Sequence, residues 1–160
     1  MSPRAACRLE LLGFTQVYDY VAGKADWLAH GLPTEGEHAQ VPRAKDVLRR
    51  EVVTALPGEA VGGVAARVAR SPYGFALVVA NDGTLLGRLH KAVLDTDPAA
   101  RAEQVMEAGP STVRPDRPLT ELAQRLRRRG LHTAIVTTPE GKLLGVVQRA
   151  DMEAQLTGRP

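Results

Sequence analysis

The chain has 160 residues and a mass of 17.2 kDa, which fits one compact domain or two small ones and excludes a large multidomain enzyme. Hydrophobic residues make up 44% and charged residues 24%, as in ordinary globular proteins, and no apolar run is long enough to span a membrane. The net charge of +3 is too small to imply nucleic-acid binding unless basic residues cluster. No signal peptide opens the chain, so a cytoplasmic location is expected.

Two further features of the composition limit the chemistry. Cys7 is the single cysteine, which excludes an internal disulfide and a cysteine-based metal cluster. Arginine greatly outnumbers lysine, and alanine, glycine and proline are abundant, a bias that suggests a GC-rich bacterial genome.

Residues 1–36 are expected to form a segment of their own, because four of the six aromatic residues lie there. The pattern predicts a helix over Arg4–Leu12, a strand over Gln16–Tyr20 and a helix from Lys24 to His30, with a glycine behind each helix. Residues 37–45 are predicted to be a linker, since prolines and glycines concentrate around them.

A repeat without gaps organises the remaining chain. Asp82–Gly87 recurs as Glu140–Gly145, an offset of 58 residues, and the same offset relates Val47 to Val105 and Val78 to Val136. The repetition places a first repeat at residues 46–95, a linker at 96–102 and a second repeat at 103–156.

Both repeats show the same order of elements. For the second repeat the pattern predicts a short helix over Glu103–Glu107, an extended segment over Ser111–Val113, a helix over Pro118–Arg129, strands over Ala134–Thr137 and Leu143–Val147, and a helix over Arg149–Leu156. In the first repeat the long helix carries Val61, Val64, Ala65 and Val68, and Phe75–Ala80 is the strand. The fold class is therefore α/β (α+β), with two pseudo-symmetric repeats of the form helix-strand-helix-strand-strand-helix.

This arrangement resembles a tandem pair of cystathionine β-synthase (CBS) domains, also called a Bateman module. The resemblance rests on Val105-Met106, Thr112–Asp116 before the long helix, Glu140–Gly145 in the hairpin, and Asp151 after it. It implies that the two repeats pack through their sheets into one unit. It also implies a cleft between the repeats, which in many such pairs binds an adenosine-containing ligand.

The first 36 residues resemble the C-terminal third of a rhodanese domain, a family of sulfurtransferases. The resemblance is carried by Arg4–Ala6, Leu11–Phe14, Val17, Gly23, Trp27 and Gly31–Pro33. In that family the nucleophilic cysteine lies in a loop that precedes the first of these helices. Cys7 lies inside the predicted helix and does not map onto that loop, so we expect no sulfurtransferase activity from it.

The second repeat carries the sharper candidate binding site. Gly145–Asp151 matches the pattern G-x-x-[ST]-x-x-D of nucleotide-binding CBS repeats, except that Gln148 replaces the hydroxyl residue. The resemblance implies that Asp151 accepts hydrogen bonds from both ribose hydroxyls, while Gln148, Arg149 and the helix N-terminus face the phosphates. It assigns the adenine contacts to backbone groups of Thr112, Val113, Thr133 and Ala134. His132, beside them, could contact a ligand or simply cap a loop. The alternative is that Asp151 only stabilises the helix N-terminus.

The first repeat has a degenerate version of this site. His90 stands where Gln148 stands in the second repeat, and Val93 stands where Asp151 stands. Valine cannot accept a hydrogen bond from ribose. Arg88, His90 and Lys91 could still attract phosphate, but the pattern favours a solvated basic strand end.

Nothing in the sequence supplies catalytic or metal chemistry. No nucleophile-and-base motif, phosphate-binding glycine loop or metal-ligand spacing of histidines is present, so we expect no enzyme activity, no cofactor and no metal. The arginines at positions 125 and 127–129 read as a solvated helix face, and we expect neither nucleic acid nor a membrane as partner.

The sequence therefore predicts a non-catalytic, ligand-sensing regulatory module. It would bind AMP, ADP, ATP or a related adenosyl metabolite and pass its state to a regulated protein that the sequence does not identify. One alternative is a protein-interaction or dimerisation module whose nucleotide sites have decayed. A second alternative is an inactive or vestigial sulfurtransferase.

Assembly is predicted from the first 36 residues and from the helices of the repeats. A strand over Gln16–Tyr20 without neighbours would need cover, either from the repeats or from a second subunit. Pairs of CBS domains commonly form two-fold dimers through their helices. We therefore expect a homodimer in which Pro118–Arg129 and Arg149–Leu156 make the main contact, with the first 36 residues folded back or exchanged.

Overall fold

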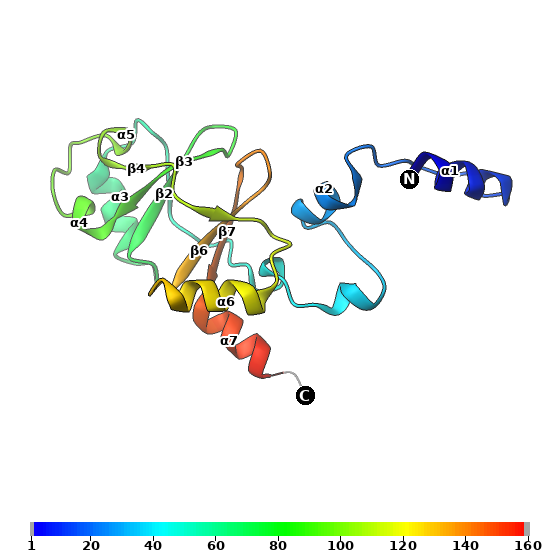
Figure 1. Cartoon of the computed structure of the whole chain (residues 1–160). Helices are drawn as coiled ribbons and strands as arrows, with labels where there is room; N and C mark the ends of the chain where they lie inside the picture. The colour runs from blue at the N-terminus through cyan, green and yellow to red at the C-terminus, as the bar shows by residue number, and fades with distance from the viewer. Residues whose placement is uncertain (1, 159–160) are drawn as a thin grey trace.

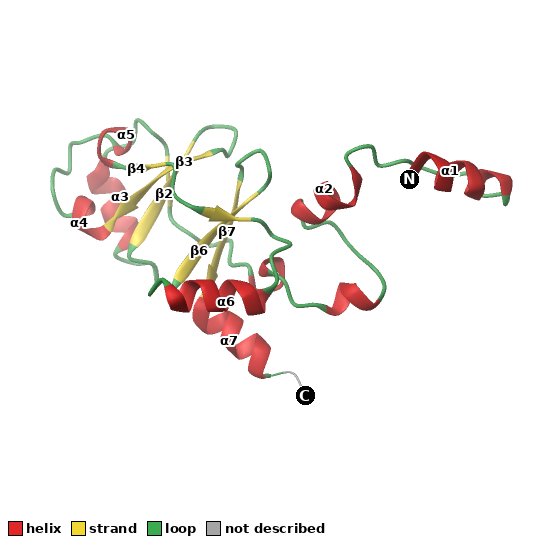
Figure 2. Ribbon diagram, viewed as in Figure 1, coloured by secondary structure: helices red, strands yellow, loops and turns green. Residues whose placement is uncertain are grey.

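Two β-sheets form the centre of the molecule, one from each repeat, in a computed structural model that describes residues 2–158 (Figures 1 and 2). The first sheet has the order β1 (Thr54–Ala55), β2 (Phe75–Val79), β3 (Leu85–His90) and β4 (Glu107–Ala108). The second has the order β5 (Thr112–Val113), β6 (Thr133–Thr137) and β7 (Leu143–Gln148). In each sheet the first pair of strands is parallel and the hairpin that follows is antiparallel.

The strand registers repeat with the same offset as the sequence. Phe75 pairs with His90 in the first hairpin, and the residues 58 positions later, Thr133 and Gln148, pair in the second. Both hairpins shift register after the same position, Val78 in one and Val136 in the other. The two halves are thus related by a pseudo-twofold axis, which passes where Thr84 bridges its own equivalent, Lys142.

Each sheet is completed by a segment from the start of the other repeat. Glu107, predicted to end a helix, instead belongs to β4 and pairs with Arg88 of β3, because the helix α5 (Ala102–Val105) stops before it. Its equivalent, Arg49, pairs with Val146 of β7. This exchange brings residues about a hundred positions apart in the sequence to the same sheet edge.

The helices cover the outer faces of the sheets (Figure 2) and enclose one core in each repeat. In the second repeat, α6 (Leu119–Arg128) and α7 (Arg149–Thr157) pack on β5–β7, and the predicted stripe of α6 is fully used, with Leu119, Leu122, Ala123 and Leu126 buried. In the first repeat, α3 (Val61–Val68) and α4 (Lys91–Leu94) cover β1–β3. A third cluster, which joins the repeats, contains Tyr73, Phe75, Leu77, Ile135 and Val146. The expected packing of the repeats through their sheets is confirmed.

The N-terminal segment extends away from this body (Figure 1). It contains α1 (Ser2–Leu11), α2 (Gly23–Ala29) and a short 3₁₀ helix (Glu37–Gln40), and a second 3₁₀ helix (Ala44–Val47) leads into the first repeat. The predicted strand over Gln16–Tyr20 is wrong: these described residues have no strand partner, and Tyr18 is 87% exposed. A strand needs a neighbour to satisfy its backbone, and the described chain places none beside this segment.

Two contacts attach the end of this segment to the rest of the chain, one to the second repeat and one to the 3₁₀ helix that leads into the first. His30 Nε2 lies 3.2 Å from Glu140 Oε1 in the β6–β7 turn. Lys45 Nζ donates to the carbonyl oxygens of Gly31 and Leu32 at 3.1 and 3.2 Å.

Among the described residues, no helix has both the length and the apolar character needed to cross a membrane.

Candidate functional site

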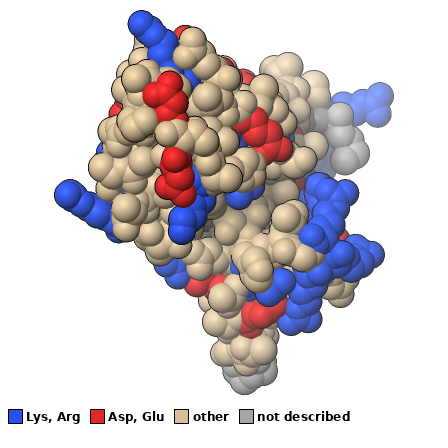
Figure 3. Space-filling view, turned by 90° about the vertical axis from the view of Figure 1, so that its left-hand side faces the viewer, with Lys and Arg blue, Asp and Glu red and all other residues tan. Residues whose placement is uncertain are grey.

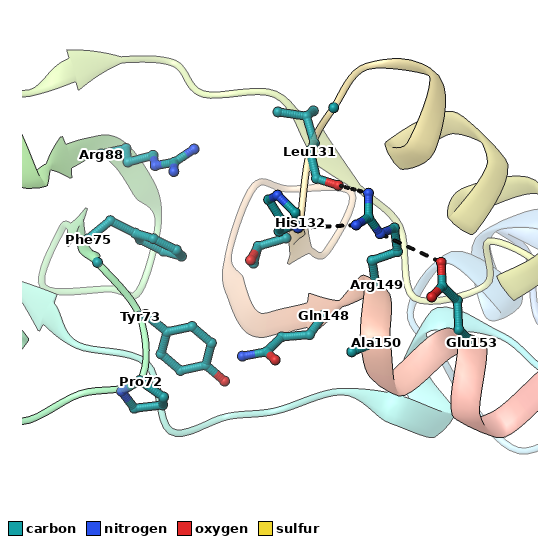
Figure 4. A pocket seen from close by; sticks show the side chains of 13 residues that line it. Pro72, Tyr73, Phe75, Arg88, Leu131, His132, Gln148, Arg149, Ala150 and Glu153 are labelled. Carbon is teal, nitrogen blue, oxygen red and sulfur yellow. Dashed lines mark hydrogen bonds and ion pairs between the residues drawn. The ribbon is translucent and has the colours of Figure 1, made fainter.

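A cavity of about 540 Å³ opens between the two repeats (Figure 4). Two pseudo-equivalent segments line it, residues 72–75 leading into β2 and 130–133 leading into β6, so it lies across the pseudo-twofold axis. The β7–α7 junction contributes Gln148, Arg149, Ala150 and Glu153, whereas the first repeat adds only Arg88 beyond its loop. The cavity therefore belongs mainly to the second repeat.

One wall of the cavity is aromatic and carries a cation. The rings of Tyr73 and Phe75 lie 5.8 Å apart, and the guanidinium carbon of Arg88 lies 4.5 Å from the centre of the Phe75 ring. The Nε of Arg88 is buried without a hydrogen-bond partner, and burial lowers the pKa of this guanidinium. A buried donor without a partner is costly, so this wall would favour a ligand that brings an acceptor.

The opposite wall is held in place by Arg149. Its backbone N–H donates to the carbonyl of His132 at 2.8 Å, and its guanidinium lies 3.3 Å from His132 Nδ1 and 3.4 Å from the carbonyl oxygen of Leu131. Glu153 approaches Arg149 Nε at 3.6 Å and also accepts from Arg127 at 2.9 Å. Figure 4 shows the Gln148 amide reaching into the cavity between these two walls. A cation and an amide thus stand at the start of α7, where the helix dipole also favours an anion.

Asp151 lies next to the cavity rather than in its lining. It borders a shallow depression of about 450 Å³ together with Val47, Leu48 and Arg49. Both of its carboxylate oxygens accept from Arg49, from Nε and from Nη2, each at 2.6 Å. The hydrogen bonds and charge of Asp151 raise the pKa of Arg49, and a smaller contribution comes from the Tyr73 hydroxyl. Arg49 is therefore paired with Asp151 and interacts weakly with Tyr73 of the aromatic wall.

The other residues predicted for the second site divide into two groups. His132 and Thr133 line the cavity with Gln148 and Arg149, as the pattern predicted. Val113 and Ala134, each 8% exposed, are packed inside the core of the second repeat, and Thr112 faces a separate small cavity beside Arg114. The structure therefore does not bring Thr112, Val113 or Ala134 to the cleft.

The residues of the degenerate first site are dispersed. His90 Nε2 contacts Glu107 Oε2 at 2.6 Å, and Lys91 borders a different cavity of about 330 Å³. Val93 packs against the core of the first repeat. Of this group, Arg88 alone lines the cavity between the repeats, together with residues of the second repeat.

Sequence reasoning missed Arg49, Tyr73 and Phe75 as residues of this site. Arg49 lies at the start of the first repeat and meets Asp151 only because the sheets exchange edge segments. The 58-residue offset could have identified Arg49. It aligns Arg49 with Glu107, which implies that the two residues occupy equivalent positions in the two halves. Elsewhere in residues 2–158, no three His, Cys, Asp or Glu side chains gather as metal ligands, and Cys7 is exposed on α1.

Comparisons with known proteins agree with this fold. The family model described as "CBS domain" matches residues 102–156. Two uncharacterized proteins from strains of Mycobacterium tuberculosis are 28% identical over 152 residues, covering 84% of this chain, and the chain spans 44% of their length.

Three solved structures illustrate the structural likeness. The cytosolic domain of the Mg²⁺ channel MgtE in complex with ATP has a TM-score of 0.64 and 24% identity, covering 73% of this chain and 50% of that one. A CBS domain pair in complex with 5′-methylthioadenosine and S-adenosyl-L-methionine has a TM-score of 0.60 and 18% identity, covering 75% and 99%. A CBS domain protein from Pyrobaculum aerophilum complexed with AMP has a TM-score of 0.59 and 20% identity, covering 74% and 100%.

These comparisons do not support the rhodanese-like resemblance of residues 1–36. For the remainder, the structural matches agree with the observed fold. Residues 102–156 match the family model of the CBS domain, and the chain has the fold of a CBS domain pair.

Proposed function

We propose that this chain is a non-catalytic sensing module that binds an adenine nucleotide or a related adenosyl metabolite in the cleft between its repeats. The observation that carries the proposal is the composition of the cavity of about 540 Å³: an aromatic wall of Tyr73 and Phe75, the cations Arg88 and Arg149, and a carboxylate, Asp151, beside it. An aromatic surface suits a base, cations suit phosphates, and a carboxylate suits the two hydroxyls of ribose.

The ligands of similar structures support the same chemical class. The three solved structures described above hold ATP, AMP, or 5′-methylthioadenosine with S-adenosyl-L-methionine. All of these molecules share an adenosyl group and differ in the charge of the group attached to it. We further propose that ligand occupancy is passed to a regulated protein.

Asp151→Ala tests the proposal directly. Loss of the charged acceptor should weaken binding of AMP, ADP or ATP about tenfold to a hundredfold in titration calorimetry. Val93→Ala, at the equivalent position of the first repeat, is the matched control and should leave the affinity unchanged. A wild-type chain that binds none of the three nucleotides would favour the alternative of an interaction module with decayed sites.

Thermal denaturation provides an independent measure of ligand binding. A ligand that binds only the folded chain adds about 2.7 kcal/mol of stability at 100 times its dissociation constant. The increase should be absent for inorganic phosphate at the same concentration, because phosphate cannot use the aromatic wall.

We also propose that the chain is a homodimer. The apolar face of α6 is used inside its own repeat, and its exposed face carries Arg125, Arg127 and Arg128. Lys and Arg side chains crowd the lower right of Figure 3. A contact through α6 would therefore be polar, with arginines of one copy meeting Glu121 of the other. Light scattering should give about twice 17.2 kDa at micromolar concentration, and a mass near 17.2 kDa would contradict the dimer.

A further inference from the structure

Asp151, the carboxylate proposed to bind ribose, is already paired with the side chain of Arg49. Arg49 presents two parallel donors to the two oxygens of Asp151, each at 2.6 Å, which is the bidentate geometry of a strong arginine–carboxylate pair. The 2′ and 3′ hydroxyls of ribose are also two adjacent donors that seek the same two oxygens. Ribose and Arg49 therefore compete for Asp151.

The backbone of Arg49 is fixed by strand pairing, whereas its exposed side chain can move independently of it. Its N–H donates to the carbonyl of Val146 at 2.8 Å and its carbonyl accepts from Val146 N–H at 2.9 Å. Gly145 permits this close approach, because a Cβ there would overlap the Arg49 carbonyl oxygen. The Arg49 side chain is 45% exposed, so the guanidinium can leave Asp151 without breaking the strand pairing.

Arg49 also lies near both hollows of the surface. It borders the depression that contains Asp151, and its pKa is raised in small part by Tyr73, which lines the main cavity. Movement of this one side chain would join the cavity to Asp151. A ligand with its base at the aromatic wall would then reach the carboxylate with its ribose.

The charge of the ligand determines whether this exchange is favourable. The cavity already holds Arg88 and Arg149, and its one acidic side chain, Glu153, is engaged by Arg127 and Arg149. A displaced Arg49 stays tethered at the rim and adds a third cation. A phosphate can pair with it, whereas a neutral thioether cannot, and a sulfonium cation would be repelled.

We infer that Arg49 competes with ribose for Asp151. The cleft therefore prefers adenosine ligands that carry phosphate to adenosyl ligands that are neutral or cationic. This inference rests on the proposed function, since it concerns which adenosyl ligand the same site accepts. The first repeat has no equivalent arginine–aspartate pair, because Glu107 replaces Arg49 and Val93 replaces Asp151 there.

The test compares AMP with 5′-methylthioadenosine, which shares the adenosyl group and lacks the charge. By titration calorimetry, the wild-type chain should bind AMP at least about tenfold more tightly. Arg49→Ala should bind 5′-methylthioadenosine more tightly than the wild type does and gain nothing for AMP, so that the preference falls about tenfold. Arg49→Lys, which keeps the charge and loses the bidentate geometry, should lie between them.

Arg50→Ala is the matched control, because Arg50 is the exposed neighbour without a contact to Asp151, and it should keep the wild-type preference. Melting temperatures of all variants verify that they fold. Nucleotide binding by the wild type with an unchanged preference in Arg49→Ala would overturn this inference and leave the proposed function standing. Tighter wild-type binding of 5′-methylthioadenosine or S-adenosyl-L-methionine than of AMP would also overturn it. Absence of binding by every ligand to the wild type and to Arg49→Ala would overturn both.

Discussion

The two repeats have nearly the same backbone and very different cleft residues. Strand registers, the register shift in the hairpin and the exchanged edge segments all recur after 58 positions. The side chains at the β-strand ends do not recur. Five pairs differ in chemistry: Phe75 and Thr133, Arg88 and Val146, His90 and Gln148, Val93 and Asp151, and Glu107 and Arg49.

The difference is most instructive at the exchanged edge segments. In the second half a basic residue of the segment, Arg49, pairs with an acid of the following helix, Asp151. In the first half the segment supplies the acid, Glu107, which pairs with His90 at the strand end. The fold requires backbone pairing at the position of Arg49 and Glu107, and it tolerates a side chain of either charge there. Backbone pairing therefore constrains the architecture, whereas the cleft side chains can differ between the two halves.

The largest difference in stability that we expect between the two halves concerns Gly145 and Gly87, the glycines that pack against the exchanged edge segments. Gly145 has φ +146°, and a Cβ there would overlap the backbone carbonyl oxygen of Arg49. At the equivalent Gly87 a Cβ would chiefly meet the flexible side chain of Met106. Gly145→Ala should reduce the free energy of unfolding by about 3 kcal/mol and Gly87→Ala by about 1 kcal/mol. Urea unfolding followed by circular dichroism measures both, and equal losses would show that the two edges are equally strained.

A smaller asymmetry is expected in the cores. Leu122 of α6 and its equivalent Val64 of α3 are both fully buried. Leu122→Ala should cost about 3 kcal/mol and Val64→Ala about 2 kcal/mol, because leucine loses more buried carbon and leaves the larger cavity. Each variant should unfold in one transition, since the cluster around Leu77 and Ile135 joins the repeats. Two separate transitions would mean that the repeats unfold independently.

Much of the fold followed from periodicity alone. The apolar stripe of α6 and the gapless offset predict the helices, the hairpins and the pairing of the two halves, because burial repeats with the geometry of each element. The helix predicted to reach Glu107 ended early, since the backbone of Glu107 pairs with β3. Exchange of edge segments is a long-range choice that leaves no local periodic signal.

The site was less predictable than the fold for the same reason. A local motif located Gln148, Arg149 and Asp151, and the loop position located His132 and Thr133. Neither Arg49 nor Tyr73 belongs to that motif, and each reaches the site through tertiary structure. The strand predicted over Gln16–Tyr20 failed because a strand is defined by its partner, which a propensity cannot supply.

The smallest predicted effect concerns the turns of the two hairpins. Glu140, in the second, contacts His30 of the N-terminal segment at 3.2 Å. The equivalent Asp82, in the first, bonds within its own turn to the backbone N–H of Thr84 at 3.0 Å and to the Thr84 hydroxyl at 2.9 Å. Only the second turn therefore holds the N-terminal segment, and this contact should depend on pH.

The direction of that dependence follows from both partners. A hydrogen bond with the Asp26 backbone, together with the charges of Asp26 and Glu140, raises the pKa of His30 above 6.5. Hydrogen bonds, with Thr138 first, and the charge of His30 lower the pKa of Glu140 below 4.5. The His30 contribution is complete below pH 6.5 and is lost as pH rises through the raised value, whereas the Glu140 contribution is complete above pH 4.5 and is lost as pH falls through the lowered value. The contact is therefore strongest between these two limits.

Hydrogen exchange of the α2 amides reports this contact. At about pH 6, Glu140→Gln should exchange faster than the wild type over Gly23–Ala29, and at about pH 8 the difference should be smaller, because the protonated fraction of His30 falls as pH rises through its raised pKa. Asp82→Asn is the matched control, and it should leave α2 protection unchanged at both pH values. Equal protection in the wild type and Glu140→Gln at about pH 6 would mean that the ion pair does not hold α2. Attachment would then rest on the hydrogen bonds from Lys45 to the carbonyl oxygens of Gly31 and Leu32.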